Sequence, residues 1–146
     1  MTHKYTHEIK TNNMKTDKII FRTTTIIIFL FEGVMPAFTS QTELAKEGIR
    51  HLGYPEYFGN ALVVFKVIGS LILLVPQAPK RLKEWAYAGF AFDFLFASIS
   101  HLAVDGVTFF SFFPLIFLGI LAVSYVYYQK LSSASYTKTI GSLSKF

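Results

Sequence analysis

Four long apolar runs constrain this chain of 146 residues more than any other feature. They cover residues 19–38, 57–75, 85–104 and 107–128. Because a helix rises about 1.5 Å per residue, each run can cross a hydrocarbon layer about 30 Å thick. The runs also lack the alternation of barrel strands. The sequence therefore predicts an all-α fold, an integral membrane four-helix bundle. A soluble all-α protein with very apolar helices is the less favoured alternative.

Polar segments flank this apolar region. Residues 1–18 and 130–146 carry many Lys, Ser and Thr side chains and show almost no apolar periodicity. Segments of this composition cannot bury enough apolar surface to order themselves. We therefore predict a flexible N-terminal tail at 1–18, a four-helix transmembrane domain at 19–129, and a flexible C-terminal tail at 130–146.

The first apolar run has two interpretations. A cleaved signal peptide would place its apolar region behind a basic start, but no A-x-A-like cleavage site follows. A retained helix that ends near Gly33 and Pro36 is favoured. Met14 begins the segment MKTDKIIF, itself an ordinary start for a membrane protein. Residues 1–13 are therefore interpreted either as a start assigned too far upstream or as a dispensable extension.

The connections between runs predict the orientation. Residues 39–56 carry charges at helical spacing, which predicts a short surface helix stopped around Gly53 and Pro55. Most Lys and Arg lie in the two tails and in the turn at 76–84, whereas the turn at 105–108 has none. Since basic residues concentrate in cytoplasmic segments, we predict that both termini are cytoplasmic.

Three ionisable residues fall at membrane depth in different runs: Glu32, Lys66 and Asp93. Counted at the helical rise, they lie about 20, 16 and 12 Å from the cytoplasmic edge, so the lysine is intermediate in depth. Charged side chains in spanning helices usually face the bundle interior. We therefore predict that the three side chains form a buried polar cluster.

The cluster has one cation for two carboxylates. Because desolvation and mutual repulsion oppose two ionised carboxylates, we expect one of them to hold a proton near neutral pH. Such a cluster suits proton exchange or a polar head group. The alternative is an ion-pair clamp that fixes helix register without chemistry, and this alternative is somewhat favoured.

Small and polar residues also follow one face of the third run. At helical spacing they predict a close-packing face rather than a ligand groove. The hydroxyls of Ser98 and Ser100 are expected to bond back to the preceding turn. His101 lies beside this face and is a candidate binding residue, as a proton carrier, a quinone contact or a metal ligand; a hydrogen-bonded histidine near the outer interface is favoured. The stripe comprises Ala86, Gly89, Asp93, Ala97 and Ser100.

Several kinds of chemistry are excluded or disfavoured. The chain has no Cys, which excludes disulfides, thiolate metal sites and iron–sulfur clusters. His51, His101 and Asp105 could approach one another outside the membrane, but their spacing is not a metal signature, so no metal is predicted. There is no phosphate loop, nucleophile elbow or paired-carboxylate hydrolase pattern, so the catalytic residues are unknown. The basic residues form no patch for nucleic acid.

Residues 44–105 contain several distinctive features: Leu52-Gly53-Tyr54-Pro55, then Lys66 with Gly69, and the segment KEWAYAGF at 83–90 leading to Asp93, Ala97, Ser100 and His101. With these features the segment resembles the DoxX-like membrane family. The resemblance implies a four-helix integral membrane protein, mostly bacterial and so of the inner membrane. Relatives include membrane subunits of oxidoreductase systems, such as thiosulfate–quinone oxidoreductases, while more distant members act as chaperones or cargo receptors.

The resemblance favours one function over two alternatives. We expect an accessory membrane subunit of a quinone-linked oxidoreductase system, with no cofactor of its own beyond a quinone contact. A partner subunit would supply the redox centre. The alternatives are a binding or transport module for a small or lipidic molecule, which could require a homo-oligomer, and a membrane chaperone or assembly factor. Under each, Glu32, Lys66, Asp93 and His101 are the candidate binding residues.

Overall fold

The computed structural model describes residues 2–143, and the side chains of residues 14–136 and 140. Within residues 2–143 the chain forms helices and short connections, with no strands. The first rod combines α1 (Thr2–Ile28), the π-helical segment η1 (Phe29–Val34) and α2 (Met35–Thr39). The remaining helices are α3 (Glu43–His51), α4 (Glu56–Leu74), α5 (Lys80–Asp105) and α6 (Phe109–Leu143).

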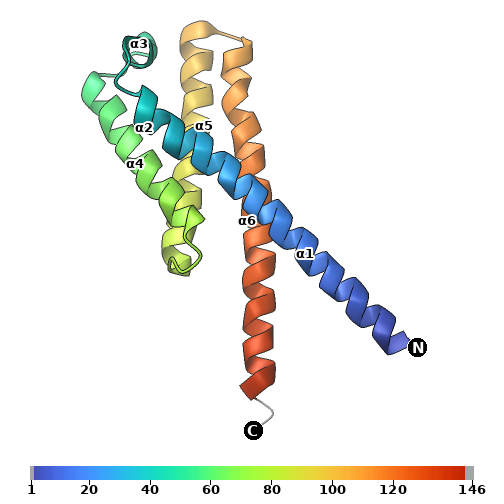
Figure 1. Ribbon diagram of the computed structural model, residues 1–146. Coiled ribbons are helices and arrows are strands. Elements are labelled where there is room, and N and C mark those ends of the chain that lie inside the picture. Colours follow the sequence, from blue (N-terminus) through green and yellow to red (C-terminus); the bar gives the residue numbers. More distant parts are fainter. Residues whose placement is uncertain (1, 144–146) are drawn as a thin grey trace.

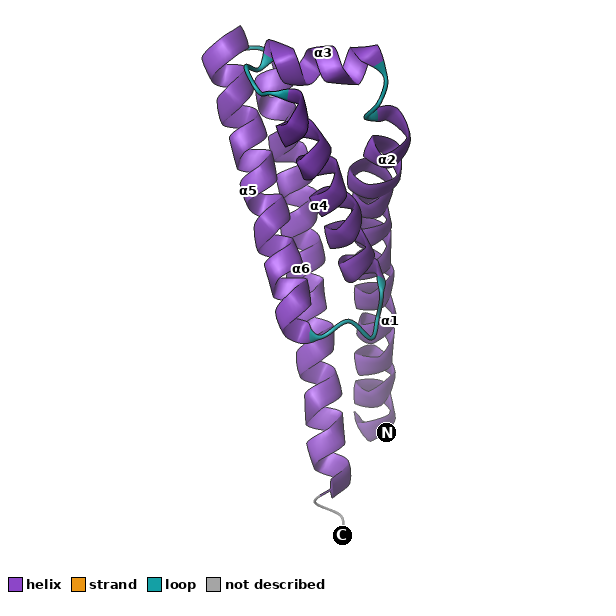
Figure 2. Cartoon of the chain, turned by 90° about the vertical axis from the view of Figure 1, so that its left-hand side faces the viewer, coloured by secondary structure: helices purple, strands orange, loops and turns teal. Residues whose placement is uncertain are grey.

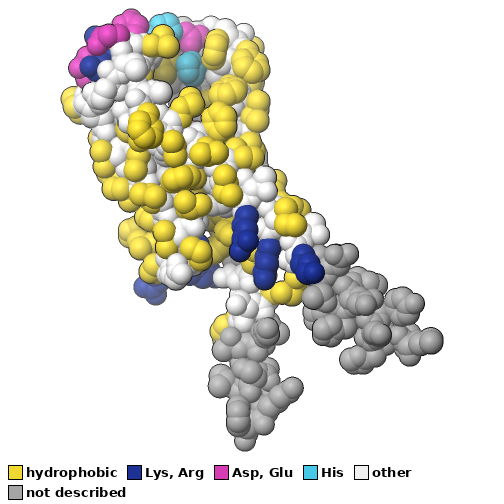
Figure 3. Space-filling model, viewed as in Figure 1, with side chains coloured by type: hydrophobic (Ala, Val, Ile, Leu, Met, Phe, Trp, Pro, Cys, Tyr) yellow, Lys and Arg dark blue, Asp and Glu magenta, His cyan; other side chains and the backbone are white. Residues whose placement is uncertain are grey.

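Four helical stretches among the described residues are long and apolar enough to cross a membrane, which confirms the predicted all-α membrane architecture. In the most apolar part of each stretch, at most 28% of the residues are buried inside the chain. Hydrophobic side chains accordingly cover the middle of the molecule in Figure 3. Such an apolar surface suits hydrocarbon rather than water. The stretches are Met14–Thr39, Glu56–Leu74, Lys80–Asp105 and Phe109–Tyr136.

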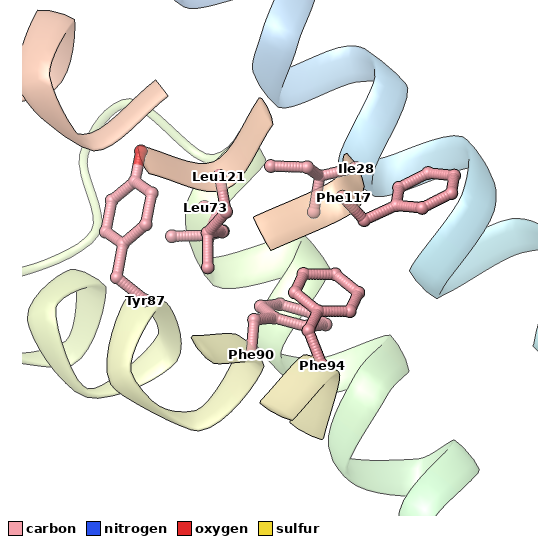
Figure 4. Close-up of a cluster of buried hydrophobic side chains, with 7 residues drawn as sticks. All are labelled: Ile28, Leu73, Tyr87, Phe90, Phe94, Phe117 and Leu121. Carbon is pink, nitrogen blue, oxygen red and sulfur yellow. The ribbon is translucent and has the colours of Figure 1, made fainter. Parts of the chain in front are cut away.

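The rods pack around a small aromatic core. In Figure 1, α1 crosses α6 obliquely, while α5 lies along α6. The second half of the first rod packs against α4, which also contacts α5. Because lipid contacts apolar side chains as readily as another helix does, close packing rather than transfer from water holds such a core. Its buried side chains, shown in Figure 4, are Ile28, Leu73, Tyr87, Phe90, Phe94, Phe117 and Leu121.

The first spanning helix does not end near Gly33 and Pro36, so that prediction was wrong. The Met35 N–H donates to the carbonyl of Leu30, five residues back, and this widened turn closes η1. Pro36 then falls near the start of α2, and the helical backbone runs through it although its ring nitrogen cannot donate a hydrogen bond. The rod therefore continues to Thr39.

The outer helices extend beyond the membrane spans. α1 continues back through residues 2–18, and α6 continues through residues 130–143. The sequence predicts flexible tails in both places, and a helical backbone does not measure mobility. The flexibility of the tails therefore stays a prediction, and residues 1 and 144–146 lie outside the described residues.

The predicted surface helix is present as α3. The Thr42 side chain accepts a hydrogen bond from the Ala45 N–H at 3.3 Å and caps the helix start. α3 lies across the end of the bundle that is opposite both termini (Figure 2). We call these two ends the α3 side and the terminal side. Figure 3 shows acidic and His side chains on the α3 side with a few Lys or Arg atoms among them, and a larger group of Lys and Arg on the terminal side.

Candidate binding site at a buried charge triad

The widened turn of the first rod carries the first acidic residue of the site. Glu32 lies in the middle of η1 and is buried, with 8% of its surface exposed. π-Helical turns inside α-helices occur frequently at functional sites, because they displace one residue from the regular ladder. η1 packs against α4, so the Glu32 side chain faces the lysine of that helix.

Lys66 of α4 bridges two carboxylates from two other helices. Its Nζ donates to Glu32 Oε2 at 2.7 Å and lies 3.0 Å from Asp93 Oδ2 of α5. The three side chains are 21%, 10% and 14% exposed, respectively. The structure thus brings together three of the four candidate binding residues, which we call the charge triad. Their role in binding stays a prediction.

The triad has a formal charge of −1 when both carboxyls are ionised. A buried ion pair gains attraction in a medium of low dielectric constant but loses the hydration of both ions. The second carboxylate has no second cation within the triad to offset its desolvation. The arrangement therefore favours either an added proton or a ligand group that donates a hydrogen bond to a carboxylate.

The triad lies where three hollows meet. The first, the α2–α4 hollow, measures about 250 Å³, is bounded by α2, α3 and α4, and includes Lys66 in its lining. The second, the Trp85 hollow, measures about 280 Å³ between α4 and α5, and both Lys66 and Asp93 line it. The third, the aromatic hollow, measures about 470 Å³, and Asp93 lines it as well. Lys66, a hydrogen-bond donor, and Asp93, an acceptor, are thus each accessible from two hollows.

The small-residue stripe of α5 lines these hollows and does not pack closely against a neighbour along its whole length. Gly89 is exposed, and a Cβ added there would meet no atom within 4 Å. Gly89 and Asp93 line both hollows between α4 and α5, while Ala97 and Ser100 line the aromatic one. The predicted close-packing face is therefore wrong at its centre. The close contact with α4 is made instead by Phe90, whose ring would lie 3.1 Å from a Cβ added at Gly69.

Tyr54 closes the α3 side of the aromatic hollow, a role that sequence analysis missed. Its hydroxyl donates to Ser100 Oγ at 2.7 Å, and Ser100 in turn donates to the Phe96 carbonyl at 2.7 Å. Its ring stacks on Phe58 with the centroids 4.7 Å apart. The back-bond predicted for Ser100 is confirmed. The one predicted for Ser98 is wrong, since its buried hydroxyl has no hydrogen-bond partner among the described residues.

His101, the fourth candidate, lies away from the triad. Its Nδ1–H donates to Asp105 Oδ2 at 2.7 Å, and the Nε2–H of His51 in α3 donates to Asp105 Oδ1 at 2.5 Å. One carboxylate thus joins the end of α5 to α3. The three side chains do meet, as their sequence positions allowed. The described residues nevertheless include no group of three or more His, Cys, Asp or Glu placed to hold a metal ion.

A second buried polar cluster lies toward the terminal side. The Ser124 hydroxyl of α6 is hydrogen-bonded to Thr25 of α1 at 3.0 Å and to Tyr87 of α5 at 2.9 Å. All three residues are at most 5% exposed. Single hydroxyls in apolar runs give little sequence signal, which is why this cluster was missed. It fixes the relative positions of three helices by satisfying polar groups in a site closed to water.

Together these features define a multi-pass helical membrane protein with a charge triad between its spans. The chain belongs to the DoxX-like family, whose pattern matches residues 20–124. This confirms the resemblance noted in the sequence, and the match includes the triad and His101. Neither the curated proteins nor the solved structures compared with the chain include a match.

Proposed function

We propose that the protein binds, within the membrane, an amphipathic molecule whose aromatic ring carries a hydroxyl group, the chemistry of a quinol. We further propose that it acts as an accessory subunit of a quinone-linked oxidoreductase. One observation supports the ligand most directly. The aromatic hollow adjoins the charge triad and presents the Asp93 carboxylate among ring faces.

The size and lining of the aromatic hollow favour a planar ring. Its volume of about 470 Å³ lies within the usual range for ligand sites, about 300–1,000 Å³. Tyr54, Phe58, Phe92 and Phe96 all contribute to its wall. Offset or edge-on contacts between aromatic rings each add about 0.5–1.5 kcal/mol beyond the area they bury. Phe92 and Phe96 are largely exposed on the span surface, so the apolar tail of a ligand can extend into lipid.

The polar groups of the hollow favour a ligand that donates a hydrogen bond. The hydroxyl hydrogens of Tyr54 and Ser100 are both used within the chain. Asp93 belongs to a triad with one more carboxylate than cations, so it can accept another hydrogen bond. Hydrogen bonds to charged groups contribute about 1.5–3 kcal/mol. A ring hydroxyl that donates to Asp93 therefore fits the site better than a ring carbonyl.

Family membership and the residues available both support the proposed accessory role. The chain contains no Cys, so no thiol can carry electrons from a bound quinol. We propose that a partner subunit supplies the redox centre and that this chain holds the quinol beside it. On the distribution of Lys and Arg, we also propose that the terminal side faces the cytoplasm of a bacterial inner membrane.

The ligand is tested with two matched probes on purified protein in nanodiscs. A short-chain quinol should raise the melting temperature, whereas its dimethyl ether, which cannot donate, should not. Gly89→Leu should abolish the shift by filling the hollow. Gly119→Leu is the control, because a Cβ there also meets no atom within 4 Å and the residue is outside the lining of the aromatic hollow. Equal shifts with both probes would refute the hydroxyl contact to Asp93.

The accessory role has a separate test. Affinity purification from native membranes, followed by mass spectrometry, should recover a subunit with a flavin, haem or iron–sulfur centre. Stabilisation by the quinol without any such subunit would overturn the accessory role and favour a binding or transport module. Recovery of a client protein whose abundance falls in Asp93→Asn cells, without quinol stabilisation, would favour an assembly factor.

A further inference from the structure

The α2–α4 hollow differs in character from the two hollows between α4 and α5. Apart from Lys66 and Asp93, the Trp85 hollow has an apolar lining. The α2–α4 hollow, in contrast, has polar side chains from its rim to its base. A hollow can hold ordered water when it is roomy and offers several hydrogen-bonding partners, and about 250 Å³ is room for several molecules. The polar lining comprises Thr39, Ser40, Gln41, Lys46, Glu56, Asn60 and Lys66.

The rim and the base of this hollow are at different depths in the membrane. At the rim, the exposed Gln41 donates through Nε2 to Asn60 Oδ1 at 3.1 Å, on the α3 side of the bundle. Lys66, which forms the base, follows Asn60 by six residues on α4, or about 9 Å along the axis. The hollow therefore runs from the α3 side down to the charge triad.

Beyond the triad, two regions lie toward the terminal side. The Trp85 hollow has apolar lining residues there, which offer ordered water a single hydrogen-bonding side chain, the indole. The contact between the first rod and α4 is closed by close packing. Gly33 and Ser70 are both buried, and a methyl group added at Gly33 would overlap the Ser70 hydroxyl. One turn further along α4, Leu73 is 2% exposed and belongs to the core shared with Ile28 and Phe90. Gaps in such a core are smaller than a water molecule.

We propose that the α2–α4 hollow is a water-filled vestibule, and that it connects the charge triad to the aqueous phase on the α3 side and not on the terminal side. Protons that a carboxyl of the triad gains or loses then pass through Lys66 Nζ, which contacts both carboxylates and lines the vestibule, to and from vestibule water on that side. The proposal goes beyond ligand binding, because it holds whether or not the aromatic hollow takes a quinol.

The absence of Cys from the chain allows a direct test, since every introduced cysteine is the only one. Val63 lines the vestibule, whereas its neighbour Val64 is exposed on the span surface and outside the vestibule lining. The two positions are at nearly the same depth, so Val64→Cys is the matched control for Val63→Cys. Ser70→Cys reports on the closed region beyond the triad.

The reagent is a charged, membrane-impermeant thiosulfonate, applied to full-length protein in vesicles sorted by orientation. Because the thiolate is the reactive form and requires water, Val63→Cys should react at least roughly ten-fold faster than Val64→Cys from the α3 side. Ser70→Cys should stay unmodified from both sides. Equal rates at Val63 and Val64, or faster reaction of Val63→Cys from the terminal side, would overturn the proposal. A failed quinol experiment leaves these rates unchanged, so the two proposals fail separately.

Discussion

Replacing Lys66 with Met is the sharpest test of the charge triad. The substitution keeps an unbranched apolar stem in place and removes the only cation that contacts Glu32 and Asp93 within the triad. Breaking a buried ion pair from one side generally costs about 3–5 kcal/mol, because the remaining charge has no partner. Protonation sets an upper limit on this loss of stability, because a buried carboxylate without a partner takes up a proton instead of remaining charged.

The protonation limit gives both a magnitude and a pH dependence. In the folded variant, one more carboxyl of the triad is protonated than in the wild type. Protonating a carboxyl with an ordinary pKa of about 4 costs about 4 kcal/mol at pH 7. The folded variant then binds more protons than its unfolded state, so its free energy of unfolding rises as the pH falls. The difference in the free energy of unfolding between wild type and variant should therefore shrink by about 1.4 kcal/mol for each unit by which the pH falls.

The measurement is the free energy of unfolding in mild detergent, titrated with a denaturing detergent at pH 8, 7, 6 and 5. Lys46→Met is the control, because Lys46 makes a surface pair with Glu43 at 3.6 Å that contributes at most about 1 kcal/mol. Replacing all three triad residues by Gln, Met and Asn should recover most of the loss. A Lys66→Met deficit that is the same at pH 8 and pH 5 would refute the reasoning.

Three further changes probe helix packing and the α3 connection. Gly33→Ala should destabilise the protein by about 1–3 kcal/mol because the added methyl overlaps the facing hydroxyl, whereas Gly48→Ala on α3, where a Cβ meets no atom within 4 Å, should not destabilise it in the same unfolding titration. Tyr87→Phe and Ser124→Ala should show a coupling energy of about 0.6 kcal/mol in a double-mutant cycle, and strict additivity would count against their hydrogen bond. Asp105→Asn should speed hydrogen exchange in α3 selectively, because the carboxylate holds α3 to α5; unchanged exchange there would contradict this link.

Much of the architecture is predictable because hydrocarbon imposes simple rules on a chain. Run length alone located the four spans, and the cost of isolated charges in lipid correctly brought Glu32, Lys66 and Asp93 together. The same rules do not determine how far apart two helices lie. Small residues on α5 predicted close approach, but Phe90 makes the contact with Gly69 of α4, while the space in front of Gly89 is open and hollows remain.

Two other features depend on geometry that local sequence does not encode. The widened turn before Pro36 contains a hydrogen bond, from the Met35 N–H to the Leu30 carbonyl, that reaches five residues back instead of four. The contact between His51 and Asp105 joins residues 54 positions apart and depends on how α3 lies across the bundle. Each is decided by tertiary packing, which composition and periodicity describe only indirectly.

The widened turn in the first rod also sets how the helix before it is rotated about the rod's axis. Each residue of a regular helix advances the azimuth by about 100°, so the residue accommodated in η1 offsets the upstream half by about that angle. Before η1, the rod faces α6 through α1; within and after it, the rod faces α4. Deleting one residue between 29 and 34 would restore a regular helix and force one of these two faces to rotate away from its neighbour. Apart from Glu32 and Gly33, this short stretch should therefore tolerate substitutions far better than changes in length.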